Sequence, residues 1–134
     1  MPTLHGLAPM LMAADLQRTI TFCTEILGFK LDGKWPDDKP CWCNLSNGFA
    51  RIMFQSPEVY KEPQPKLTGR LYFYTDDVMA IHERVRERVK VIEGPEIYFY
   101  GMKQIAIEDC NGYVLTVGQN TDKPPTCGEE HVEA

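Results

Sequence analysis

Hydrophobic positions recur along the chain with two spacings, one typical of helices and one typical of strands. Residues 15–27 begin at the candidate cap Asp15 and place apolar side chains on one helical face until Gly28, which predicts a helix. Residues 77–88 show the same spacing after Asp76 or Asp77. Runs typical of strands cover residues 7–13, about 29–35, about 41–46, 49–55, 70–75, about 90–94, about 102–109 and 113–118.

This order of elements repeats. The second helix begins 62 residues after the first. Each copy also has an Asn-Gly pair before its last strand, Asn47-Gly48 in the first and Asn111-Gly112 in the second, and each pair predicts a tight hairpin. We therefore expect an α+β fold made of two tandem βαβββ modules within one domain, residues 1–118. Module one covers about 5–56 and module two about 69–118, with a proline-rich linker at about 57–68 and a loose tail at 119–134.

Alternate side chains of a strand point to opposite faces of its sheet. In residues 49–55, Ala50, Ile52 and Phe54 form the apolar set that should pack under the helix. The opposite set is free to contact a ligand, and two such sheets facing one another would enclose a cleft. The residues expected on these opposite faces include Met10, Met12, Trp42, Asn44, Arg51, Met53, Gln55, Arg70, Tyr72, Tyr74, Val114 and Thr116.

Composition and charge narrow the possible partners. The chain is 43% apolar with a net charge of −5, which argues against nucleic-acid binding because such proteins usually present a basic surface. No apolar run approaches the roughly 20 residues that span a bilayer, and the N-terminus has no signal-peptide pattern, so we expect a cytoplasmic protein without a membrane partner. Five irregularly spaced cysteines are expected to be reduced.

Metal-binding signals are weak. Cys41 and Cys43 could share a metal ion, but no second Cys or His pair completes a four-ligand site, and packing explains them better. His5 could approach a site on the first strand only through a shift in register. His82 on the second helix and His131 in the tail are expected to face solvent.

Two stretches carry a family resemblance. MLMAADLQRTITFCTEILGFKL, residues 10–31, resembles the opening pattern of the vicinal oxygen chelate superfamily, and YGMKQIAIEDCNGYVLTVGQ, residues 100–119, resembles its closing pattern. That superfamily includes glyoxalases, bleomycin-resistance proteins, fosfomycin-resistance enzymes and extradiol dioxygenases. The likeness covers residues 7–118 and implies paired βαβββ modules around a concave site, usually in a homodimer whose modules are often swapped.

The resemblance also implies four metal-ligand positions, one on the first strand and one on the last strand of each module. The matching residues are Ala8, Arg70, Arg51 and Thr116, where the enzymes carry His, Gln or Glu. None is a suitable ligand, and the two arginines would repel a divalent cation. The chain is therefore closest in character to the metal-free, bleomycin-resistance-like members, and we expect neither a metal nor another cofactor.

These members stack an aromatic residue, at the position of Tyr100, on their ligand. Bleomycin is cationic, whereas Arg51 and Arg70 favour a ligand with a carboxylate, a phosphate or a polarised carbonyl. Alternatively, these arginines pair internally, with Glu108 as the best partner. The residues expected to contact ligand are Trp35, Trp42, Arg51, Met53, Gln55, Arg70, Tyr72, Tyr100 and Thr116.

The leading hypothesis is a metal-independent small-molecule binding protein of the bleomycin-resistance type, with no catalytic residues. The main alternative is a metal-dependent lyase or dioxygenase of the glyoxalase or extradiol type. A metal-free enzyme that uses Tyr72, Tyr74 or Glu108 as acid or base, and a dimer that binds a protein partner, also stay open.

Overall fold

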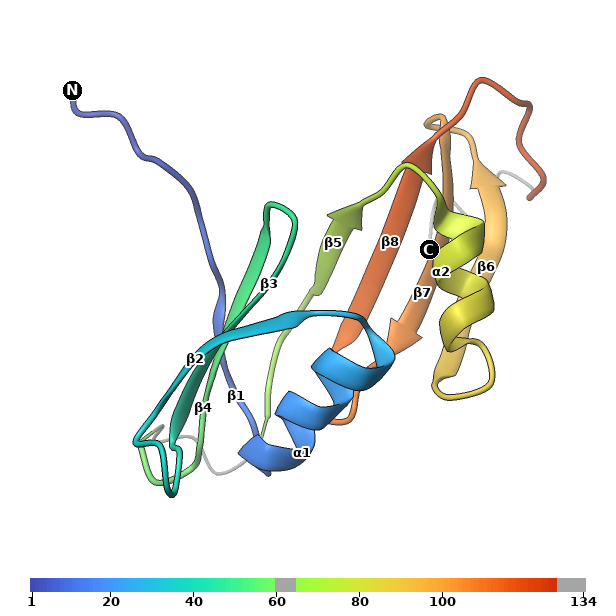
Figure 1. The fold of residues 1–134 in the computed structure, drawn as a ribbon. Coiled ribbons are helices and arrows are strands. Elements are labelled where there is room, and N and C mark those ends of the chain that lie inside the picture. Colours follow the sequence, from blue (N-terminus) through green and yellow to red (C-terminus); the bar gives the residue numbers. More distant parts are fainter. Residues whose placement is uncertain (60–64, 128–134) are drawn as a thin grey trace. The chain divides into compact units, whose positions relative to one another are not determined.

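The computed structural model describes residues 1–59 and 65–127. It divides into two compact units, Met1–Lys66 and Leu67–Ala134, each of which is described by itself (Figure 1). The boundary between the units falls within the expected linker, part of which lies outside the described residues. Among the described residues, no helix has the length and apolar character that crossing a membrane requires.

The first unit is a four-stranded sheet with one helical segment. Its strands run in the order β1-β4-β3-β2, with β1 parallel to β4 and the other neighbours antiparallel. The helix α1 continues directly into the π-helical segment η1. The bounds are β1 Met10–Met12, α1 Leu16–Thr21, η1 Phe22–Ile26, β2 Lys30–Trp35, β3 Trp42–Asn47 and β4 Ala50–Gln55.

The second unit repeats this plan. Its strands run in the order β5-β8-β7-β6, again with one parallel neighbour pair, β5 and β8. The helix α2 packs on β7 and β8. The bounds are β5 Arg70–Tyr74, α2 Val78–Val85, β6 Lys90–Tyr98, β7 Met102–Glu108 and β8 Val114–Asn120. The predicted α+β fold of two tandem βαβββ modules is therefore confirmed.

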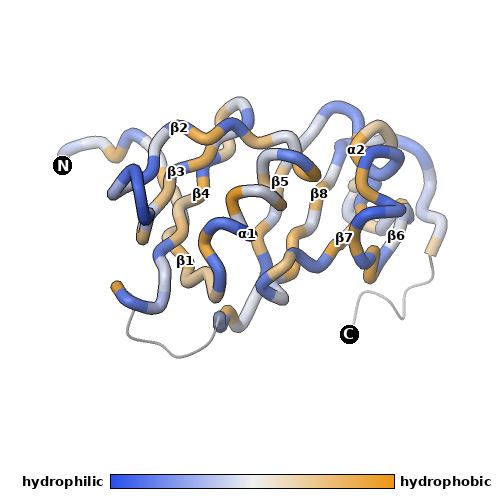
Figure 2. Tube along the Cα trace, turned by 60° about the horizontal axis from the view of Figure 1, so that its bottom comes forward, coloured by the Kyte–Doolittle hydropathy of each residue, from blue (hydrophilic) through white to orange (hydrophobic). Residues whose placement is uncertain are grey.

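Burial follows the alternation predicted from the sequence. In β4, Ile52 and Phe54 are buried, whereas Arg51, the residue before Ile52, is exposed. Polar and apolar positions also alternate along α1 and α2 (Figure 2), and their apolar positions supply Leu16, Ile20, Val78 and Val85 to the two cores. Each sheet thus buries the face that meets its helix, and on the second sheet the centre of the opposite face, at Gln104, Ala106 and Thr116, is buried as well.

Side chains cap both helices as the sequence predicts. The Asp15 carboxylate accepts a hydrogen bond from the Arg18 backbone N–H at 3.0 Å, and Asp77 accepts one from Ala80 at 3.0 Å. In α2 a second cap comes from β8, because Gln119 Oε1 accepts from the Val78 backbone N–H at 2.8 Å. This contact ties the start of α2 to the last strand of its own sheet.

The two hairpins differ, contrary to the prediction that both are two-residue Asn-Gly turns. Asn47 is still paired in β3, and the tight turn consists of Gly48, at φ +60°, and Phe49. Between β7 and β8 the connection comprises the five residues 109–113. This longer loop is organised by Asp109, whose Oδ1 accepts from the backbone N–H groups of Asn111 at 2.9 Å and Tyr113 at 2.8 Å.

Several element ends also differ from the prediction. β1 contains only Met10–Met12, and β6 continues past residue 94 to Tyr98 through two register irregularities. The tail is not loose from residue 119 onwards, because β8 ends at Asn120 and the Thr126 backbone N–H donates to Ile97 O at 2.9 Å. The rest of the expected tail, residues 128–134, lies outside the described residues.

Asp109→Ala is expected to lower the free energy of unfolding by about 2 kcal/mol, because two backbone N–H groups lose their acceptor in a loop where Asp109 is 8% exposed. Urea denaturation followed by circular dichroism measures this loss. Equal stability of the variant and the unmodified protein would contradict the role assigned to Asp109.

Asp109→Asn is the matched control, because it keeps the accepting oxygen and removes the charge. Burial raises the pKa of Asp109, so its ionisation opposes folding, and its contribution to stability is lost as pH rises through the folded-state pKa. The stability of Asp109→Asn should therefore fall less than that of the unmodified protein as pH increases through this range.

Candidate functional site

The face of the second sheet that is turned away from α2 gathers most of this unit's strand tyrosines, and we call it the open face. Pairing register arranges its side chains in rows that run across β5, β8, β7 and β6. One row contains Tyr72, Thr116, Ala106 and Glu93, and the next contains Tyr74, Gly118, Gln104 and Glu96.

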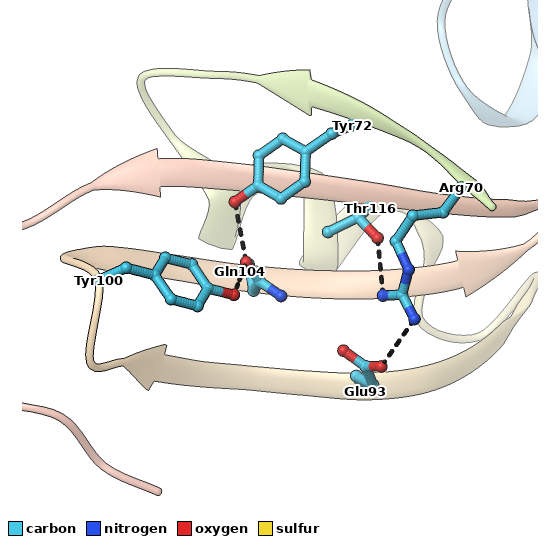
Figure 3. A network of polar contacts seen from close by, with 6 residues as sticks. All are labelled: Arg70, Tyr72, Glu93, Tyr100, Gln104 and Thr116. Atoms are coloured by element: carbon cyan, nitrogen blue, oxygen red, sulfur yellow. Dashed lines mark hydrogen bonds and ion pairs between the residues drawn. The ribbon is translucent and has the colours of Figure 1, made fainter. Parts of the chain in front are cut away.

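Gln104 lies near the centre of the open face and joins two tyrosines (Figure 3). Its Oε1 accepts a hydrogen bond from the Tyr72 hydroxyl and another from the Tyr100 hydroxyl, each at 2.8 Å. Tyr72 comes from β5 and Tyr100 from the turn between β6 and β7, so one amide oxygen links both margins of the sheet. Gln104 itself is only 4% exposed.

Aromatic rings form a cluster around this amide. Tyr98 and Tyr100 stack with ring centroids 5.7 Å apart and planes 9° apart, and Phe99 meets Tyr100 edge-on at 5.1 Å. Tyr72 packs against Tyr74 at 5.2 Å. Tyr74, Phe99 and Tyr100 remain exposed, so the cluster presents ring surface to solvent. Such a surface suits a planar, largely apolar ligand.

The phenol groups of this cluster are hydrogen-bond donors at neutral pH. Burial raises the pKa of Tyr72 and the pKa of Tyr98 to about 12, and it also raises the pKa of Tyr100. A phenol with so high a pKa is a poor general base near neutrality. Tyr72 therefore does not fit the role of base in a metal-free enzyme.

Arg70 pairs internally, but not with the expected partner. Its Nη1 donates to Thr116 Oγ1 at 3.1 Å, and its Nη2 lies 3.2 Å from Glu93 Oε1 (Figure 3). The prediction of Glu108 as its partner is wrong, since Glu108 lies 3.7 Å from Lys90 Nζ instead. Lys90, Glu108 and Arg70 share one row, whereas Glu93 lies one row further along the sheet and within reach of the long guanidinium group.

The remaining predicted ligand contacts lie on the first unit. The register places Trp35, Trp42 and Gln55 in one row across the first sheet, and Met53 lies in the next row. Both rows are on the face opposite to the buried Phe54. Trp35 is 67% exposed, and Trp42, Met53 and Gln55 are half-buried.

Arg51 lines an open groove of about 730 Å³ on the first unit, together with His5, Ala8 and Phe49. Within the described ranges, its side chain has no hydrogen bond or ion pair. Within the first unit, Arg51 therefore keeps its charge available, and its alternative pairing with Glu108 of the second unit stays a prediction. His5 does reach the neighbourhood of Ala8, although the other groups in the groove include no carboxylate or cysteine.

The structure corrects one of the four positions that match the family's metal ligands. Met10 and Tyr72 each lie five residues before a helix cap, and Met10 pairs with Met53 whereas Tyr72 pairs with Thr116. Met53 is thus the counterpart of Thr116, in place of Arg51. Counting from the Asn-Gly pair of each hairpin does not give this correspondence, because the loop between β3 and β4 has two residues and the loop between β7 and β8 has five.

The residues at these positions do not fit a divalent metal ion. Ala8 has no donor, Met53 offers a thioether, and the Thr116 hydroxyl is bonded to the Arg70 guanidinium. In residues 1–59 and 65–127, no three His, Cys, Asp or Glu side chains gather closely enough to hold a metal. Cys43 of the Cys-Trp-Cys run is buried, which raises its pKa to about 11 and keeps the thiol protonated.

Sequence reasoning missed three residues of the open face. Gln104 is a polar residue between Met102 and Ala106 on one face of β7, which is a usable signal for a functional position. Glu93 could not be placed, because register irregularities in β6 break the two-residue alternation on either side of it. Gly118 is needed because a Cβ there would collide with the Tyr72 hydroxyl and approach Met102 Cε to 2.8 Å.

Gly118→Ala is expected to lower the free energy of unfolding by about 2 kcal/mol, because the added methyl group displaces Tyr72 from Gln104. Tyr72→Phe removes the hydroxyl that the methyl group strikes. In a double-mutant cycle, the combined variant should therefore lose less stability than the sum of the single changes. Chemical denaturation of all four proteins measures the coupling, and additive losses would show that Tyr72 does not lie over Gly118.

Comparison with proteins of known structure shows several chains with this fold. TnmS3, an antibiotic binding protein from Streptomyces sp. CB03234, is 27% identical with a TM-score of 0.72, over 90% of this chain and 99% of that one. TioX from Micromonospora sp. ML1 is 15% identical with a TM-score of 0.74, over 87% and 98%. A lactoylglutathione lyase from Agrobacterium tumefaciens is 20% identical with a TM-score of 0.68, over 89% and 96%.

The comparison of sequences confirms the resemblance found in residues 7–118. No curated protein matches the chain. The sequence model of one family, however, matches residues 6–117, which is most of the chain. This protein therefore belongs to the Glyoxalase/Bleomycin resistance protein/Dioxygenase superfamily.

Proposed function

We propose that this protein binds a small, planar aromatic or amphiphilic molecule without the help of a metal ion, as a binding protein of the bleomycin-resistance type. The observation that carries the proposal is the contact between Arg70 and Thr116. Two positions that hold metal ligands in the family's enzymes are here joined to each other by a hydrogen bond. A guanidinium group at such a position repels a metal cation.

The aromatic cluster on the open face supports binding of a ring system. Tyr100 lies at the position where the bleomycin-resistance-like members stack an aromatic residue on their ligand. Its ring is 49% exposed and is backed by the stacked ring of Tyr98. The similarity to TnmS3, which is described as an antibiotic binding protein, agrees with this proposal. Arg70, Tyr72 and Tyr100 are the proposed contacts on this face, whereas Thr116, which is fully buried, holds Arg70 in place instead of meeting the ligand directly.

A metal-dependent lyase or dioxygenase would need a different set of side chains at these positions. The similarity to a lactoylglutathione lyase, at 20% identity, concerns the fold alone. Chemical analysis of the purified protein separates the two functions, because an enzyme of that type has to carry its metal in a stoichiometric amount.

Protein purified without a histidine tag is expected to contain no stoichiometric Zn, Ni, Mn or Fe by elemental analysis. Its thermal stabilisation by a panel of planar aromatic compounds, including naphthalene and fluorene derivatives, should be unchanged after treatment with a chelator, since no metal takes part in binding. Stoichiometric metal, or binding that disappears with the chelator, would favour the metal-dependent enzyme.

Substitutions at Tyr100 locate the binding observed in that panel. Tyr100→Ala should weaken binding about fivefold, because one aromatic stacking contact contributes about 1 kcal/mol. Tyr100→Phe keeps the ring and should bind more tightly than Tyr100→Ala. Met79→Ala, on the exposed surface of α2, is the control and should leave the affinity unchanged. Equal affinities of all three variants would remove Tyr100 from the site.

We also propose that residues 1–118 act as one domain and that two copies of the chain form a homodimer in the cytoplasm. Large apolar side chains near the N-terminus and at the β3–β4 turn have no cover. Leu4 and Leu7 are each 86% exposed, and Phe49 is fully exposed. Leu7 and Phe49 line the same groove, and exposed apolar residues that lie together often belong to an interface. All five cysteines are free, as expected in a reducing compartment.

The homodimer predicts a solution mass of twice 15.3 kDa in size-exclusion chromatography with light scattering. Leu7→Asp combined with Phe49→Asp should shift the protein to the monomer mass, because two charges enter an apolar contact. Met79→Glu, which places a charge on exposed α2, is the control and should remain dimeric. A monomer mass for the unmodified protein would contradict the dimer.

A further inference from the structure

The side-chain amide of Gln104 is only half used by the protein. Its oxygen accepts two hydrogen bonds, from Tyr72 and from Tyr100, each at 2.8 Å. Its nitrogen, Nε2, makes no hydrogen bond to any residue in the described part of the chain. Gln104 is nevertheless 4% exposed, and an amide donor buried to this extent normally has a partner.

The free nitrogen can still be reached from outside. The one polar side-chain atom in the described residues that is both fully buried and without a partner is Ser56 Oγ. Gln104 Nε2 therefore keeps contact with the surface. In Figure 3 it points away from the two tyrosine hydroxyls and lies between Tyr100 and the Arg70–Glu93 pair. A ligand that covers the open face would exclude water from this nitrogen. The ligand would then have to accept the hydrogen bond that the nitrogen otherwise donates to water.

Neighbouring charges favour a neutral partner for this donor. The guanidinium of Arg70 is already shared between Thr116 and Glu93. An anionic ligand would have to displace Glu93 from Arg70 or remain beside its negative charge. A ring carbonyl accepts a hydrogen bond without this repulsion and keeps the planarity that suits the exposed ring of Tyr100.

We propose that Gln104 Nε2 donates a hydrogen bond to a neutral carbonyl oxygen on a planar aromatic ligand, while Tyr100 stacks on its ring. This inference rests on the proposed binding function and deepens it: the ligand class becomes aromatic ketones and quinones, and Gln104 becomes the residue that selects them. The tyrosine hydroxyls hold the amide oxygen, which turns the nitrogen towards the ligand.

Three probes with one tricyclic frame test the proposal: 9-fluorenone has a carbonyl, fluorene has no acceptor, and 9-fluorenecarboxylate is anionic. Affinities are measured by quenching of intrinsic fluorescence on the full chain. We expect 9-fluorenone to bind about tenfold more tightly than fluorene, as for one hydrogen bond to a desolvated donor, and also more tightly than the carboxylate.

Gln104→Glu, studied above neutral pH where its carboxylate is ionised, keeps an acceptor for both tyrosines and removes the donor. The ratio of its affinities for 9-fluorenone and fluorene should fall to about one, whatever its affinity for fluorene itself. Gln17→Glu, an equal change of charge on exposed α1, is the control and should keep that preference. If Gln104→Glu loses fluorene binding as well, Gln104→Met provides a second donor-free variant, and persistence of the preference in it overturns the proposal.

The outcomes separate this inference from the proposed function. Equal binding of 9-fluorenone and fluorene would overturn the role of Gln104 and leave an aromatic-binding protein. Tightest binding of the carboxylate would also overturn it, in favour of recognition by the arginines. Failure of all three probes, together with a panel of planar aromatic compounds, would overturn the binding function itself.

Discussion

The open face of the second sheet depends on the hydrogen bonds that Gln104 receives. An amide oxygen buried in the middle of a sheet face needs donors, and the only strand neighbour directly beside it on β8 is Gly118, which has no side chain. Tyr72 lies over that glycine and reaches Gln104 from one side, and Tyr100 reaches it from the other. The hydrogen bonds to this one oxygen thus hold two rings that come from different elements.

For the proposed aromatic ligand, this arrangement orders the rings before binding. Tyr100 is 49% exposed, and an exposed side chain normally loses rotamer freedom when a ligand covers it. Its hydroxyl is held by Gln104 and its ring is stacked on Tyr98, so much of that freedom is already lost in the folded protein. Tyr100 therefore loses this conformational entropy when the protein folds, and a ligand that stacks on its free side would lose less binding free energy to the ordering of the ring.

The sequence was sufficient to predict the features that depend on alternation and on local signals. The cap Asp15, the repeat of the modules and the face to which Arg51, Arg70 and Tyr72 point follow from residue spacing alone. For the second helix the sequence offered Asp76 or Asp77, and the structure selects Asp77. Features that depend on chain irregularities could not be predicted. Because the register of β6 is irregular, the sequence does not show which row contains Glu93. Because the two hairpin loops differ in length, the residue that corresponds to Thr116 is Met53 and not Arg51. Both errors come from insertions that a two-residue period cannot detect.

The two modules differ at the matching positions of their first and last strands. Tyr72 and Thr116 on the second sheet correspond to Met10 and Met53 on the first, and Arg70 corresponds to Ala8. The first module has flexible methionines at these positions, and methionine adapts its shape to whatever packs against it. The hydrogen-bond network of Arg70, Tyr72, Gln104 and Thr116 is thus specific to the second module, and the matching positions Met10 and Met53 of the first supply adaptable apolar surface.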